Sequence, residues 1–459
     1  MKYFNILALF LLCMNLQLSA QTNPAITEWL QNNTLTGSYY MSGNPTAVSN
    51  GILVNCQSVQ YSANWAYIST KGIPAYPTGP FQDGNPSQAS DQNAIFKIPL
   101  TPQPNTGTPT PTTMGNIGVF INGVALFDYR DGVAWNTSTN SLCGGPGNPP
   151  CPGGPNTAQY WNRDAIVAER PGFDCSKGHP AMGNYHHHQN PSAFKLDLNV
   201  ISNVCNLYDA DGLYVIDSTA HSPLIGFAYD GYPIYGAYGY KNTDGTGGIT
   251  RMRSGYQLRN ITARTTWADG TDVPDGPAVN TTYPLGYFRE DYEFINHPNN
   301  PEYLDVHNGR FCITPEYPNG TYAYFATVNE THNSAFPYVV GPTFYGQKTA
   351  QKVTSISEAV TQYIPSTTSV PSSDFKPFSY SVFPNPASEL IAVQVGQILR
   401  QEVKVELLDI NGKKVQQKII PQGGTITYFD LQTVYTGVYL LKISQGEDSY
   451  TQKIVVAKD

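Results

Sequence analysis

The sequence has few charged residues, and basic ones are the scarcer kind. Lys, Arg, Asp and Glu make up 13% of the 459 residues, and 26 basic against 34 acidic side chains leave a net charge of −8. A nucleic-acid-binding domain needs clustered positive charge, so this composition argues against such a partner. After the first twenty residues, no apolar run approaches the roughly 20 residues that a membrane helix needs. The sequence therefore predicts neither a nucleic-acid partner nor a membrane span.

Residues 1–20 have the features of a secretory signal peptide. One Lys is followed by an apolar stretch that is too short to cross a bilayer, and small residues precede Gln21. Export places the mature chain in an oxidising compartment, and six of the seven cysteines follow this segment. An even number of cysteines in a secreted protein predicts disulfides, so we expect three. One of them should join Cys143 to Cys151 across the turn CGGPGNPPC.

The chain is rich in residue types that are common in turns and strands. Gly 41, Pro 36 and Tyr 32 are all high, which favours a mainly β protein with many turns. Residues 346–378 are rich in Ser, Thr, Pro and Gln and indicate a linker. The chain is thus divided into a turn-rich β domain at residues 21–345 and a smaller C-terminal unit at residues 379–459.

The C-terminal unit has the pattern of an antiparallel β-sandwich. FPNPASELIAVQV begins an alternating strand, and KVELLDINGKKVQQKII forms a hairpin around Asn411-Gly412. The Phe383–Pro386 opening, this hairpin, the strand start at Thr436–Tyr439 and the terminal KIVV resemble the Por secretion, or type IX, C-terminal sorting domain. The resemblance implies an Ig-like sandwich that the type IX secretion machinery recognises, and a location outside the cell or on its surface.

The larger domain contains a repeated pattern. Residues 117–127 and 225–235 both begin with Ile-Gly, turn at Asn-Gly or Asp-Gly, and end on apolar or aromatic residues. KGHPAMGNYHHH follows the first hairpin, and NGRFCITPEYPNGTYAYF follows the second. We interpret this as an internal duplication of a hairpin and strand unit. The second copy then has Arg310, Ala323 and Phe325 where the first has His179, His186 and His188.

Four of the 8 histidines lie within ten residues, at 179–188. Side chains alternate along a strand, so His186 and His188 should share one face, about 6.5–7 Å apart, while His187 points to the other face. Two imidazoles on one face can bind a single ion if further ligands join them. The candidate metal ligands are His179, His186, His188 and His221, with Asp174 or Asp230 as further candidates. A nitrogen-rich site fits Cu or Zn. The alternatives are a buried Tyr/His hydrogen-bond network and a proton-transfer site.

The first copy of the repeat resembles the YHYH domain family. The family is named for a Tyr-His-Tyr-His strand after a Gly-His step, and Tyr185, His186 and His188 fall on this motif. His187 stands where the second Tyr would be, and Asp230–Gly236 matches the other hallmark, an Asp-Gly-Tyr-Pro-Ile-Tyr-Gly hairpin. The resemblance implies no particular reaction.

Three classes of function are therefore open. The histidine cluster favours a secreted or cell-surface protein that binds a metal ion. A metal-dependent hydrolase of an extracellular polymer would also need a carboxylate base, for which Asp230 and Glu169 are candidates. The 32 Tyr and 5 Trp residues motivate a third class, a surface adhesion or glycan-binding module.

Overall fold

The protein is mainly β, as predicted. The structure, a computed structural model, describes residues 23–458 apart from 82–87, 146, 155–158, 198–202, 209–211, 366–379, 396–398, 400 and 447. The expected signal peptide lies outside the described residues. The α-helices are short, α2 (Pro24–Thr27) and α3 (Ala165–Glu169). In the described part, no helix has the length and apolar character that crossing a membrane requires.

An antiparallel sheet of five strands forms one layer of the larger domain. Its order is β23 (Gln351–Val353), β5 (Ala94–Pro99), β4 (Trp65–Thr70), β3 (Cys56–Tyr61) and β24 (Thr361–Tyr363). The two edge strands, β23 and β24, come from residues 346–378, the range expected as a linker. Residues 366–378 of that range lie outside the described residues, so the domain boundary stays a prediction.

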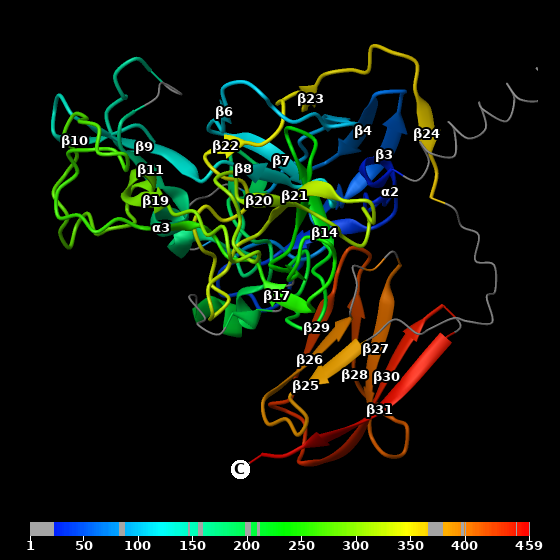
Figure 1. The fold of residues 1–459 in the computed structure, drawn as a ribbon. Coiled ribbons are helices and arrows are strands. Elements are labelled where there is room, and N and C mark those ends of the chain that lie inside the picture. The colour runs from blue at the N-terminus through cyan, green and yellow to red at the C-terminus, as the bar shows by residue number, and fades with distance from the viewer. Residues whose placement is uncertain are drawn as a thin grey trace, which may run out of the picture.

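A sheet of eight strands forms the centre of this domain (Figure 1). Its order is β12 (His179–Ala181), β13 (Asn184–His187), β8 (Ala125–Phe127), β7 (Asn116–Phe120), β14 (Leu224–Ala228), β15 (Pro233–Tyr235), β21 (Thr321–Phe325) and β20 (Gly309–Cys312). One hydrophobic core is shared by both sheets, and it includes Phe96 of β5, Val119 of β7 and Phe227 of β14.

The strand order confirms the predicted duplication. The hairpins β7–β8 and β14–β15 pair through β7 and β14, with Val119 opposite Phe227 at the centre. Outward from this centre, each hairpin adds a parallel strand, β13 or β21, and then an antiparallel edge strand, β12 or β20. The two halves of the sheet are therefore related by an approximate two-fold axis.

The register of the two halves agrees residue by residue. In the first half, His179 lies opposite His186, and in the second half Arg310 lies opposite Ala323. The parallel pairs match as well. They are His187 with Leu126 in the first half and Tyr324 with Ile234 in the second.

A tyrosine and an aspartate close the turn before each edge strand in both halves. The Tyr185 hydroxyl donates to Asp174 at 2.9 Å, and the Tyr322 hydroxyl donates to Asp305 at 2.8 Å. Each aspartate also accepts a hydrogen bond from the backbone four residues later, where the edge strand approaches. Asp174 is fully buried, and burial raises its pKa to about 7. The candidate ligand Asp174 thus has a structural role in this turn.

Smaller sheets carry the loops around this centre. A three-stranded sheet has the order β10 (Ser141–Cys143), β9 (Arg130–Asn136) and β11 (Asn162–Asp164). The two-stranded sheets are β1 (Thr36–Tyr39) with β2 (Val48–Leu53), β16 (Tyr238–Tyr240) with β17 (Ile249–Arg251), β18 (Tyr256–Leu258) with β19 (Tyr292–Phe294), and β22 (Thr343–Phe344) with β6 (Thr110–Pro111). The 3-10 turns are η1 (Arg170–Gly172), η2 (Phe194–Leu196), η3 (Asn203–Asn206) and η4 (Arg289–Asp291).

The C-terminal unit is a β-sandwich with its own core, as predicted. One sheet has the order β25 (Tyr380–Phe383), β26 (Leu390–Val395) and β29 (Ile426–Asp430). The other has the order β28 (Lys414–Ile420), β27 (Val403–Leu408), β30 (Gly437–Gln445) and β31 (Asp448–Val456). The sandwich, drawn orange to red in Figure 1, packs Ile426 and Tyr428 against Val215 of the larger domain.

The cysteines only partly follow the prediction. Cys143 is bonded to Cys151, as expected, and Cys175 is bonded to Cys205. The expectation of three disulfides is wrong, because Cys56 and Cys312 are free and buried. Cys56 begins β3 and Cys312 ends β20, so the two residues belong to different sheets.

The paired Tyr–Asp hydrogen bonds predict similar effects of the same mutation in the two halves. Tyr185→Phe and Tyr322→Phe should each lower the free energy of unfolding by about 1–3 kcal/mol, because the side chain of Asp174 or Asp305 loses a hydrogen-bond donor. Thermal unfolding measures the effect, with Tyr160→Phe as the control because Tyr160 is 46% exposed. If only one of the two variants differs from the control, the two hydrogen bonds are not equivalent.

Candidate metal centre

Three of the four candidate histidines meet at the edge of the eight-stranded sheet. His179 lies in β12, His186 lies in β13, and His188 directly follows β13. The Nε2 atom of His188 is 3.1 Å from Nε2 of His186 and 3.4 Å from Nε2 of His179. All three side chains are buried, with exposed fractions of 6% or less. The shared face of His186 and His188 was predicted from strand alternation, and the β12–β13 pairing adds His179 to it.

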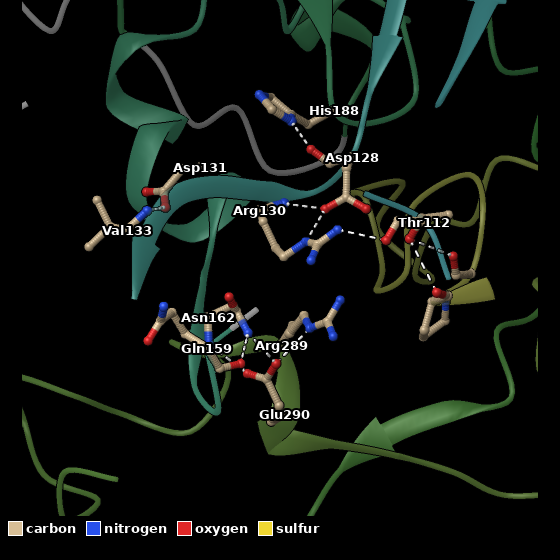
Figure 2. Close-up of polar contacts among 12 residues, drawn as sticks. Thr112, Asp128, Arg130, Asp131, Val133, Gln159, Asn162, His188, Arg289 and Glu290 are labelled. Atoms are coloured by element: carbon tan, nitrogen blue, oxygen red, sulfur yellow. Dashed lines mark hydrogen bonds and ion pairs between the residues drawn. The ribbon is translucent and has the colours of Figure 1, made fainter. Parts of the chain in front are cut away.

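Hydrogen bonds fix the orientation of two of these rings. The Nδ1 atom of His186 donates to the Asn184 carbonyl at 2.8 Å. Nδ1 of His188 donates to the Asp128 carbonyl at 2.6 Å, as Figure 2 shows. Since the two carbonyls hold the Nδ1 protons, Nε2 is the atom of each ring that faces the cluster, and in the neutral ring it is the nitrogen with the lone pair. The same arrangement orients metal-binding histidines in other proteins.

Asp128 is itself held in place by an arginine. Its carboxylate accepts hydrogen bonds from the backbone and Nε of Arg130 at 3.0 and 2.6 Å, and Arg130 also donates to the Thr112 carbonyl (Figure 2). Burial raises the pKa of Asp128, but the Arg130 guanidinium outweighs this and lowers it below its usual value. The carbonyl that orients His188 therefore belongs to a rigid part of the chain.

A carboxylate, that of Glu169, completes the cluster. Glu169 is the last residue of α3, which begins after Asp164, whose side chain accepts a hydrogen bond from the Ile166 backbone. One Glu169 oxygen, Oε2, is 3.3 Å from Nε2 of both His179 and His188. The sequence suggested Glu169 as a candidate base, but gave no signal that it would lie against the histidines.

Burial and the charges within the cluster shift the pKa values of its members in different directions. Burial would raise the pKa of Glu169, yet His179 and His188 lower it below its usual range. Burial and the neighbouring His179 and His188 rings lower the pKa of His186 well below its usual value. For His188, burial lowers the pKa but Glu169 raises it above its usual value. Ionised Glu169 and neutral His186 are in the forms that coordinate a metal ion, whereas His188 holds its proton more firmly and would have to release it when an ion binds.

The spacing of the cluster matches a coordination shell. Ligand atoms about 2.0–2.1 Å from a tetrahedral ion are about 3.3–3.4 Å apart. The two measured nitrogen pairs and the two nitrogen–oxygen pairs lie between 3.1 and 3.4 Å, and the ligand nitrogens of the three histidines all lie within 4.8 Å of one another. The three histidines are therefore close enough to share one ion, and Glu169 lies beside two of them.

Aromatic rings enclose this cluster on the protein side. Phe127 stacks on His186 with ring centroids 3.9 Å apart, and Phe173 meets the edge of His179 at 4.9 Å. Glu169 is the most exposed member, with 26% of its side chain accessible. The cluster thus has an apolar wall and one side that faces solvent at Glu169.

His187 and Asp230 have structural partners away from the cluster. Nε2 of His187 is 2.8 Å from the Tyr76 hydroxyl, its Nδ1 donates to the Lys177 carbonyl, and burial lowers its pKa to about 3. Asp230 accepts from the Tyr324 hydroxyl at 2.6 Å and from the Gly346 backbone. Neither side chain is part of the histidine cluster.

The structure does not bring His221 to the other three histidines. Its ring packs against Tyr235 and Phe325, in the other half of the sheet, and against Tyr240 of β16. Its Nδ1 donates to the Ser222 carbonyl, and burial lowers its pKa to about 4. The spacing of the histidines along the chain could not predict that His221 lies apart from the cluster, because His221 and His188 belong to different halves of the duplication.

The second half of the sheet has an arginine at the position of His179. The Arg310 guanidinium donates to the carbonyls of Lys241 and Pro301, the latter at 2.5 Å, and to that of Tyr240. Ala323 and Phe325 stand where His186 and His188 would be and offer no ligand atom. In this half, a guanidinium therefore ties the edge strand to the surrounding loops.

Comparison with known protein families identifies both parts of the chain. Residues 381–457 match the secretion system C-terminal sorting domain, which marks the protein as cargo of the type IX system, exported to the cell surface or beyond. A search of the curated proteins finds no match. Residues 95–337, which include both halves of the duplicated sheet and all four clustered side chains, match the model of the YHYH protein family. The chain therefore belongs to the YHYH family.

Proposed function

We propose that this secreted protein binds a single Cu or Zn ion through His179, His186 and His188, with Glu169 as a fourth ligand. The observation that carries the proposal is the 3.1 Å separation of Nε2 of His186 from Nε2 of His188. Both rings donate from Nδ1, so their Nε2 atoms are the ones that meet at this distance. A metal ion bound to both nitrogens would take the place of a proton shared between them.

The donor set supports this choice of metal. Imidazole nitrogens suit Zn and Cu, whereas Mg and Ca prefer shells built of oxygen. Three nitrogens and one carboxylate oxygen give a four-coordinate site of the kind that Zn adopts. Cu binds nitrogen ligands more tightly than Zn does in general. Elemental analysis of the purified, untagged mature protein identifies the ion.

The proposal predicts which histidines matter for affinity. His186→Gln or His188→Gln should weaken metal binding by at least about tenfold, or about 1.4 kcal/mol, because each removes a ligand. His221→Gln is the matched control and should leave the affinity unchanged, since His221 lies in the other half of the sheet. Calorimetric titration of the three variants measures this. Equal losses in all three would show that the cluster is not the site.

A second candidate function is a metal-dependent hydrolase of an extracellular polymer. It is favoured by Glu169, which combines contact with two histidines and the greatest exposure in the cluster. In this case, Glu169 would act as a general base toward a water molecule. The three histidines would then hold the ion, with a coordination position left open.

Replacing Glu169 distinguishes the two roles. If Glu169 is a ligand, Glu169→Gln should weaken metal binding by about tenfold or more, because an amide is a poorer ligand than a carboxylate. If it is a base, the affinity should hold, while any chelator-sensitive hydrolysis of a polysaccharide or protein substrate is lost. Calorimetry and activity screening with and without chelator give the two readings. An unchanged affinity without such an activity in the unaltered protein contradicts both roles.

The C-terminal sandwich should act as an export address that the type IX machinery binds. Deleting residues 379–459 should leave a folded protein in the periplasm, because the sandwich has a separate hydrophobic core. Cell fractionation measures the distribution, and fusion of the same residues to an unrelated periplasmic protein is the control, which should reach the medium. Normal export of the truncated protein would overturn this role.

A further inference from the structure

A pocket of about 370 Å³ lies on the larger domain, apart from the histidine cluster. We call it the Arg289 pocket. It is built where β18, β19 and the residue before β9 meet, and its volume is in the range of ligand sites, about 300–1,000 Å³. The lining residues that matter here are Tyr129, Tyr256, Trp267, Asp269, Arg289 and Tyr292. None of them belongs to the cluster.

Aromatic rings form most of the walls of the Arg289 pocket. Tyr292 stacks on Phe336 with ring centroids 4.1 Å apart and an interplanar angle of 6°, and Tyr256 meets Phe336 edge-on at 5.3 Å. Trp267 packs against Trp161 at 5.7 Å and remains partly exposed. These contacts hold the rings rigidly, so the pocket offers flat apolar faces to a ligand.

One cation, Arg289, stands among these rings and is paired through Nε with Glu290. Nε of Arg289 donates to Glu290 at 2.6 Å, and Glu290 in turn accepts two hydrogen bonds from Asn162 (Figure 2). Among the described residues, the terminal nitrogens of Arg289 have no hydrogen-bond partner. The Arg289 side chain is 25% exposed. A guanidinium held through Nε presents its two terminal nitrogens as a fork that fits a carboxylate.

A buried hydroxyl without a partner lies beside this arginine. The Arg289 guanidinium carbon is 6.0 Å from the centre of the Tyr129 ring. Tyr129 is 1% exposed, and its hydroxyl has no hydrogen-bond partner among the described residues. A buried polar group in this state needs an explanation, and a bound ligand supplies one. The pocket also contains an exposed carboxylate, that of Asp269, which can accept hydrogen bonds from ligand hydroxyls.

We propose that the Arg289 pocket binds a sugar unit of an extracellular polysaccharide and prefers an acidic sugar. A sugar ring has apolar faces for Trp267 and Tyr256, hydroxyls for Tyr129 and Asp269, and, in a uronic acid, a carboxylate for Arg289. The protein is exported, so it meets such polymers. This site is independent of the metal ion.

Binding of two matched oligosaccharides tests the proposal. The full-length mature protein is titrated by calorimetry with a short oligogalacturonate and with a neutral galactan oligomer of the same length, both with chelator present. We expect the acidic oligomer to bind more tightly. Trp267→Ala should weaken it at least about tenfold, which is a loss that calorimetry resolves. Trp65→Ala is the control, because Trp65 is a partly buried Trp on β4 outside the pocket.

Two conservative variants still test the sugar site if Trp267→Ala disturbs the folding of the chain around Trp267. Arg289→Lys keeps the charge but lacks the fork, and should remove most of the preference for the acidic oligomer. Tyr129→Phe removes only the hydroxyl and should weaken both oligomers several-fold. The proposal is overturned if neither oligomer binds, if an acidic peptide binds and the oligosaccharides do not, or if all three pocket variants bind like the Trp65→Ala control.

Discussion

The pairing of β7 with β14 is the contact on which the larger domain depends. It joins the two halves of the duplicated sheet, and it requires an unusually close approach of two backbones. A Cβ atom at Gly226 would lie 2.6 Å from the Val119 carbonyl oxygen, and one at Gly118 would lie 2.9 Å from that of Phe227. The Ile-Gly start of each hairpin is therefore a requirement of this interface, and every outer strand takes its register from it.

Patterns within one segment predicted the structure well, and contacts between segments were harder to foresee. Hairpin turns and strand alternation predicted the duplication and the shared face of His186 and His188, because both follow from backbone geometry over a few residues. Glu169 was missed as a partner of the histidines because it lies on α3, between the two repeated segments of the first copy, where the repeat pattern gives no position. The count of cysteines predicted one bond too many because an even number says nothing about the distance between Cys56 and Cys312.

The position of the cluster explains why its groups stay rigid. β12 and β13 are the outermost strands of their half of the sheet, and an edge normally frays. Here α3 covers the histidines through Glu169, and Asp128 fixes the ring of His188. Side chains from several elements can converge at the edge of a sheet. Here their contacts with the histidines hold this edge as firmly as a core.

The two halves of the sheet differ at one corresponding position of their edge strands. In the second half this position carries a covalently attached charge, the Arg310 guanidinium, which is present as soon as the chain folds. In the first half it carries His179, and the ion that we propose for the cluster would come from the surrounding fluid. On that proposal, the second edge is indifferent to the chemistry of its surroundings, while the first edge would respond to it. The duplication would then have become an asymmetric pair, with one self-sufficient half beside one that depends on its environment.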